Sequence, residues 1–128
     1  LVRNDSSEAP RRLSVRKNAA LADATMFTTT PALFKDESRK GFDRLESAVR
    51  LSRYGVDCYA FAMLASGFAD IVVEAGLQPY DIVALIPLIE QAGGVVTQRD
   101  GSPAEKGGDI VAAASPELHR AALDLLNS

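Results

Sequence analysis

The chain alternates short strand-like runs with longer segments of helical pattern, and this alternation limits the folds open to it more than any other feature. Strand-like runs are expected at 24–30, 49–55, 70–76, 94–101 and 107–115, and helices at 31–49, 58–68, 79–92 and 116–126. Such an order is typical of proteins in which helices cross between the strands of a parallel sheet. The sequence therefore predicts an α/β fold, a layered sheet with crossover helices.

Residues at the helix boundaries support these elements. Thr30–Pro31 and Ser115–Pro116 each place a capping hydroxyl before a proline, which is favoured at the first helical position. Gly93–Gly94 is expected to end the helix at 79–92, and Pro87 is expected to kink it.

Length, charge and cysteine content narrow the function classes. With 128 residues, of which 47% are hydrophobic, the chain suits one domain. A net charge of −3, with basic residues in both halves, gives no electrostatic footprint for nucleic acid. The longest apolar run, Ile82–Ile89, is too short to span a membrane, and the lone Cys58 cannot form an internal disulfide. We therefore expect a cytoplasmic protein in which Cys58 is a buried structural residue rather than an activated thiol.

Two turns that follow strands carry acids and glycines where no structural rule requires them. The stretch "RYGVDC" contains Gly55 and Asp57, and "EAGLQPYD" contains Glu74 and Asp81. Ligands of α/β sheets bind outside the carboxyl ends of the strands, so we expect these four residues to share one edge. Helix N-termini at that edge would attract an anion, and carboxylates beside an anion suggest a bridging cation.

Each candidate also has a purely structural interpretation. Asp57 could cap the helix that begins near Cys58, and Asp81 in a first helical turn would gain roughly 0.3–1 kcal/mol from the helix dipole. Glu74, at a strand end, could equally be exposed. His119 is expected on the surface of an amphipathic terminal helix, and three aromatic side chains are expected to be packing residues: Tyr59, Phe61 and Tyr80.

Residues 79–101, "PYDIVALIPLIEQAGGVVTQRDG", resemble the carboxyl-terminal signature of the inositol monophosphatase-like, magnesium-dependent phosphatases. In that signature an aromatic–Asp pair opens a helix that ends in Ala-Gly-Gly before a strand. The segments "YGVDCYA" and "GLQPYD" are most similar to the histidinol-phosphate phosphatase branch, where they replace the Gly-Thr-Ala and Trp-Asp segments of inositol monophosphatases, and "AALADATMFTTTPALF" also fits that branch.

The resemblance implies the carboxyl-terminal domain of the family's αβαβα sandwich. We expect residues 1–128 to form this single α/β domain within a longer protein. Two short runs, Leu1–Arg3 and Arg11–Arg16, flank the turn-rich "NDSSEAP" and predict a hairpin. Residues 1–18 would then be a hairpin remnant of the preceding domain.

The resemblance also assigns roles to individual residues. Asp81 would be the carboxyl-terminal metal-ligand aspartate, which reaches from a helix start to Mg²⁺ and so also lies at the substrate phosphate. Glu74 matches the family's substrate-contacting glutamate. Gly55, Val56 and Asp57 match the segment that lines the substrate pocket, and an acid at position 57 would suit a cationic amine such as that of histidinol.

The reaction implied is hydrolysis of a phosphate monoester by water activated on Mg²⁺, with Arg53 as a candidate to assist the anion. Such hydrolysis can need accelerations of up to about 10²¹-fold. The family's amino-terminal motifs, a Gly-Asp-x-x-Glu glutamate and an Asp-Pro-x-Asp-Gly-Thr segment, do not occur in these residues. We therefore expect the chain to need the missing amino-terminal half as its partner and to be inactive alone; family members are also often homodimers.

Histidinol phosphate is the favoured substrate of the longer protein, which would place it in histidine biosynthesis. Inositol 1-phosphate is the near alternative. A different class of function is a non-catalytic ligand-binding or dimerisation module. Phosphate release separates these classes, because only the enzyme hypothesis expects turnover that depends on Asp81.

Overall fold

The computed structural model describes residues 14–15, 20–55 and 59–127. The predicted hairpin at 1–18 therefore lies outside the described residues, apart from Ser14 and Val15, and so do Val56, Asp57 and Cys58. In the described part of the chain, no helix is long and apolar enough to cross a membrane.

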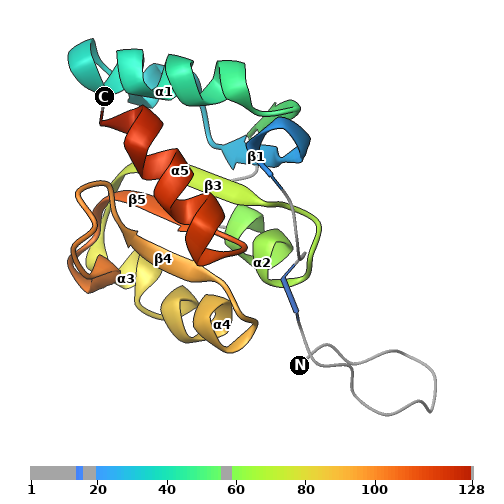
Figure 1. The fold of residues 1–128 in the computed structure, drawn as a ribbon. Helices are drawn as coiled ribbons and strands as arrows, with labels where there is room; N and C mark the ends of the chain where they lie inside the picture. The colour runs from blue at the N-terminus through green and yellow to red at the C-terminus, as the bar shows by residue number, and fades with distance from the viewer. Residues whose placement is uncertain (1–13, 16–19, 56–58, 128) are drawn as a thin grey trace.

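One sheet of five strands forms the centre of the described structure, in the order β2-β1-β3-β5-β4 (Figure 1). The strands are β1 (Thr25–Thr28), β2 (Leu51–Tyr54), β3 (Ile71–Leu77), β4 (Val95–Gln98) and β5 (Gly108–Ala113). The α-helices are α1 (Asp36–Ala48), α2 (Tyr59–Ala65), α3 (Pro79–Ile82), α4 (Leu85–Gln91) and α5 (Pro116–Leu126). Short 3-10 helices occupy η1 (Leu21–Asp23), η2 (Pro31–Leu33) and η3 (Ala104–Lys106).

The predicted α/β fold is confirmed, but the sheet is mixed rather than wholly parallel. Strand β1 is parallel to β2 and β3, whereas β5 is antiparallel to both β3 and β4. Parallel strands need a crossover of a dozen or more residues, usually with a helix. The β4–β5 connection, residues 99–107, contains only the short η3, so it returns the chain as a hairpin.

Helices cover both faces of the sheet. Helix α5 packs on β3, β4 and β5 and beside α1, whereas α2 packs on β3 and α4, and α4 packs on β4. Figure 1 shows α1 and α5 together on one side of the strands, with α2, α3 and α4 on the other. All four residues of β1 are buried, as expected for a strand covered on both faces.

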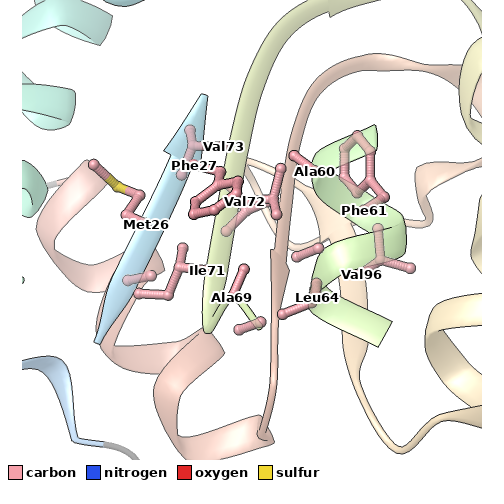
Figure 2. Close-up of a cluster of buried hydrophobic side chains, with 14 of the residues drawn as sticks. Met26, Phe27, Ala60, Phe61, Leu64, Ala69, Ile71, Val72, Val73 and Val96 are labelled. Atoms are coloured by element: carbon pink, nitrogen blue, oxygen red, sulfur yellow. The ribbon is translucent and has the colours of Figure 1, made fainter. Parts of the chain in front are cut away.

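The hydrophobic core joins the central strands to α2. Figure 2 shows Met26 and Phe27 of β1 and Val72 of β3 in the same cluster as Phe61 and Leu64 of α2. Phe61 is fully buried, which confirms its expected packing role. Two other aromatic predictions are wrong for this chain, because Tyr59 is 67% exposed and Tyr80 is 80% exposed.

Two predicted helices begin or break differently. Thr30 does act as an N-cap, but of η2, where its hydroxyl accepts the Ala32 N–H at 3.3 Å, and α1 begins only at Asp36. The helix expected at 79–92 is divided into α3 and α4, with a break at 83–84. Proline at 87 has no N–H for the carbonyl four residues earlier, which lies at that break. Ser115 caps α5 as predicted, accepting the Leu118 N–H at 3.1 Å.

Candidate functional site

The carboxyl ends of β1 and β2 meet at one edge of the sheet. Thr28 and Tyr54 are the last paired residues of these strands. Immediately after β2, the Gly55 N–H donates to the carbonyl oxygens of Thr28 (3.2 Å) and Thr29 (2.8 Å). Gly55 is therefore fixed against the end of β1, with φ +83°, a conformation that favours glycine.

Glu74 of β3 reaches the same point from the other side of β1. Its side chain is buried, with 3% of its surface exposed, so the alternative that it is solvent-exposed is wrong for this chain. Carboxylate oxygen Oε1 accepts from the Thr28 hydroxyl (3.1 Å) and the Thr29 N–H (2.5 Å), and Oε2 accepts from the Thr29 hydroxyl (2.7 Å). Thr28 and Thr29 thus connect the two predicted substrate residues, Gly55 and Glu74.

These two threonines were not among the predicted site residues. The signal in the sequence was the polar run "TTT" directly after the apolar end of a strand and before Pro31. A strand that continues into consecutive hydroxyl residues at its carboxyl end offers donors at the edge where ligands of such sheets bind.

Asp81 lies at the third residue of α3, beyond the carboxyl end of β3. It is half-buried, and its Oδ2 accepts the N–H of Gln78, the N-cap residue, at 2.9 Å. This is the acceptor half of a capping box, a structural role that adds to the predicted place of Asp81 in a first helical turn. A carboxylate has about four lone-pair sites, so one N–H leaves acceptor capacity for a cation.

Asp81 can serve as one ligand of a magnesium site, but the described residues do not complete such a site. Among the residues that the structure describes, no group of three or more His, Cys, Asp or Glu side chains could hold a metal ion. Glu74 already accepts three hydrogen bonds from threonines. Mg²⁺ prefers hard oxygen ligands and is often held by only one or two carboxylates together with substrate oxygens and water, which fits the chemistry of Asp81.

The structure places some of the predicted site residues together and does not describe others. It brings Gly55 and Glu74 together through Thr28 and Thr29, and it places Asp81 after the same strand as Glu74. Val56 and Asp57 lie outside the described residues, so their roles stay predictions. Arg53 is exposed and lines a hollow of about 680 Å³ along β2, together with Phe27, Tyr54, Met63 and Phe68 among others.

With this geometry in place, comparison with known proteins identifies the family. The sequence matches the inositol monophosphatase family over residues 4–128. The chain belongs to this family.

The chain is similar to a bifunctional phosphatase, to histidinol-phosphatases and to inositol monophosphatases. The bifunctional phosphatase IMPL2 of Arabidopsis thaliana is 42% identical over 123 residues, which are 89% of this chain and 36% of that protein. A histidinol-phosphatase of Mycobacterium tuberculosis is 33% identical over 121 residues, 93% of this chain and 46% of that protein. The rat inositol monophosphatase 2 is 30% identical over 115 residues, 84% of this chain and 40% of that protein. The chain therefore spans less than half the length of these relatives.

Solved structures show the same fold. An inositol monophosphatase from Zymomonas mobilis superimposes with a TM-score of 0.85 at 36% identity, over 91% of this chain and 47% of that one. The extragenic suppressor protein SuhB of Bartonella henselae gives a TM-score of 0.82 at 25% identity, over 92% of this chain and 46% of that one. The expected resemblance to the inositol monophosphatase fold is thus confirmed.

Proposed function

We propose that this chain is the carboxyl-terminal part of a Mg²⁺-dependent phosphate monoester hydrolase, to which it contributes one metal ligand and part of the substrate pocket. The observation that carries the proposal is the placement of Glu74 in β3 and Asp81 in α3, on either side of one strand–helix connection, with Glu74 joined to Gly55 through Thr28 and Thr29. Membership of the inositol monophosphatase family supports the reaction class.

Each residue would have a distinct task. When bound, Mg²⁺ would supply charge neutralisation at the phosphoryl group and a water with a lowered pKa. Asp81 would hold that ion at the start of α3, where the capping hydrogen bond fixes its carboxylate. Glu74 would accept a hydrogen bond from the organic part of the substrate. The threonines set the orientation of its carboxylate before any ligand arrives. Such preorganisation lowers the cost of positioning the substrate.

Histidinol phosphate is the substrate we favour. Support comes from the similarity to histidinol-phosphatases and from an acid at position 57, which would pair with the substrate's ammonium group. Inositol phosphate is the second candidate, since an inositol monophosphatase from Zymomonas mobilis is 36% identical. An inositol ring offers hydroxyl groups but no cation, so Asp57 should matter much more for histidinol phosphate.

The reaction class is tested by phosphate release from the longer protein that contains this chain. Asp81→Asn keeps an oxygen that can cap α3 but removes the charge, and should lower kcat/KM at least about 100-fold, in line with the loss of one electrostatic catalytic group. Asp43→Asn, an exposed acid in α1, is the control and should leave the rate unchanged. Equal rates for the two variants would refute the role of Asp81.

Substrate choice is tested separately with Asp57→Ala. We expect this variant to lose activity on histidinol phosphate while keeping its activity on inositol 1-phosphate. If both rates are unaffected, position 57 does not recognise the amine, although the protein can still be a phosphatase.

A further inference from the structure

The turn before β5 lies directly against residues 77–79, the connection where β3 ends and α3, the helix that carries Asp81, begins. Gly107 has φ +76° and ψ −150°, a conformation open essentially to glycine alone. A Cβ atom at Gly107 would lie 2.4 Å from the Leu77 carbonyl oxygen, 2.9 Å from the Gln78 carbonyl carbon and 3.0 Å from the Pro79 nitrogen. All three atoms are backbone, so no flexible side chain can move aside. The missing side chain at 107 is what lets the two turns touch.

Two further contacts hold the same connection. The Gly76 N–H donates to Asp109 Oδ1 at 3.2 Å, and Leu77 is paired with Gly108 in the sheet. The β3–β5 pairing shifts register between Glu74 and Leu77, so the intervening backbone does not follow a regular ladder. Its path is therefore set by the 107–109 turn as well as by β-sheet hydrogen bonds.

Asp109 is itself anchored on its far side. Its carbonyl oxygen accepts the Arg99 N–H at 2.8 Å, which ties the 107–109 turn to the end of β4. Residues 107–109, which include the first two residues of β5, are thus held in place on both sides.

The position of the connection matters because it separates the two acids. Gln78, whose backbone the Gly107 contact touches, donates the N–H that holds the Asp81 carboxylate. Moving this backbone would therefore move the Asp81 oxygen atoms relative to Glu74, which is held independently by Thr28 and Thr29. Misplacement of a catalytic group by about 1 Å can cost about 100-fold in rate.

We infer that Gly107 is a positioning residue that sets the Asp81 carboxylate relative to Glu74, with Asp109 as its helper. The functional part of this inference rests on the proposed phosphatase function, but the structural part can be measured without it. Gly107 would act only through the backbone of Leu77, Gln78 and Pro79 and would touch neither substrate nor metal.

The test compares Gly107→Ala with Gly101→Ala. Gly101 also has a left-handed conformation, with φ +89°, but nothing lies within 4 Å of a Cβ placed there. The control therefore also places a Cβ at a positive φ, but without the contact. In ¹H–¹⁵N spectra of this chain, Gly107→Ala should shift the Gln78 and Asp81 amide signals, whereas Gly101→Ala should leave them in place.

In the longer protein, Gly107→Ala should raise the Mg²⁺ concentration for half-maximal activity at least about fivefold, while Gly101→Ala should not change it. Should Gly107→Ala fail to fold, Asp109→Ala serves instead, because it removes the acceptor of the Gly76 N–H, along with a charge that acts on Arg99, and should produce the same signal shifts on a smaller scale.

The inference is overturned if Gly107→Ala and Asp109→Ala, whichever of them fold, leave the Gln78 and Asp81 amide signals at the positions seen with Gly101→Ala. It is also overturned if the signals shift but the Mg²⁺ requirement does not. If the longer protein releases no phosphate from any substrate, the proposed function fails, and the spectra alone then decide whether Gly107 positions Asp81.

Discussion

His119 joins helix α5 to strand β4 through a partly buried hydrogen bond. The expectation that it lies on the surface is wrong, because the residue is only 7% exposed. Its Nε2 atom lies 2.8 Å from the Thr97 hydroxyl oxygen, and that hydroxyl donates to the Gln98 carbonyl at 2.7 Å. Since the hydroxyl has one proton, which it gives to the Gln98 carbonyl, the ring donates and its Nε2 atom carries a hydrogen in this arrangement.

Burial lowers the pKa of His119 below its ordinary value of 6.5. The unfolded chain therefore binds a proton more readily than the folded chain. The part of the free energy of unfolding that depends on a neutral His119 is fully present above pH 6.5, and it is lost as the pH falls through the lower pKa of the folded state. Because the chain has a single histidine, its ring signals can be titrated by NMR without ambiguity. A folded-state pKa at or above 6.5 would contradict the prediction.

Glu74 gives a second test at the residue scale. Glu74→Gln replaces one acceptor oxygen by an NH₂ group, so at least one of the threonine donors at Thr28 and Thr29 loses its acceptor. A buried donor without a partner costs about 1–3 kcal/mol, and we expect that loss in the free energy of unfolding measured with urea. Glu90→Gln, on an exposed position of α4, is the matched control. Equal unfolding midpoints for the two variants would show that the threonine contacts contribute nothing.

At the scale of elements, the crossing of α1 and α5 depends on Gly41. A Cβ atom there would lie 2.1 Å from the Leu126 carbonyl oxygen and 2.2 Å from Arg99 Nη2. Arg44 donates to the Leu125 carbonyl at 2.7 Å, and Arg99 donates to that of Leu126. The two cations thus bind the end of α5 where the helix dipole is negative, and Gly41 leaves the space for this arrangement.

Gly41→Ala sets two effects against each other. Alanine favours a helix over glycine by about 1 kcal/mol, but the new methyl group meets a backbone carbonyl that can move only if α5 moves, and overpacking costs about 1–3 kcal/mol. Because the contact is at 2.1 Å, we expect the clash to win and the protein to lose stability in thermal unfolding. Ser47→Ala, exposed on the same helix, should change stability by less than about 0.5 kcal/mol. A Gly41→Ala variant more stable than the control would refute this account.

The elements themselves could largely be predicted, because periodic patterns and caps are local. What local patterns did not specify is strand direction: β5 looks like the other strands, and only the lack of a crossover helix in 99–107 marks it as antiparallel. The stripe of Leu118, His119, Ala122 and Leu126 did contain the signal for a buried histidine, since these positions share one face of α5.

At the scale of the whole molecule, the candidate site could be predicted only in part. Glycines and acids after strands pointed to Gly55, Glu74 and Asp81 as candidates, but the side chains that orient Glu74 come from the end of a different strand, β1, and the residue after it, which only the sheet order brings beside it. The contact between Gly107 and the Asp81 connection is equally non-local. Such relations depend on register and on hairpin geometry, which no short motif encodes.

The isolated chain gives the last test, because a single carboxylate should hold Mg²⁺ weakly. If the dissociation constant is about 10 mM or more, adding about 10 mM Mg²⁺ stabilises the folded chain by no more than about 0.4 kcal/mol. A complete metal cage saturated at about 100 times its dissociation constant would instead add about 2.7 kcal/mol. Urea unfolding with MgCl₂, and with NaCl at equal ionic strength, measures the difference. We expect almost none, together with no phosphate release. A gain well above 0.4 kcal/mol that Asp81→Asn abolishes would mean that Asp81 and its neighbours bind the ion without help from the rest of the protein.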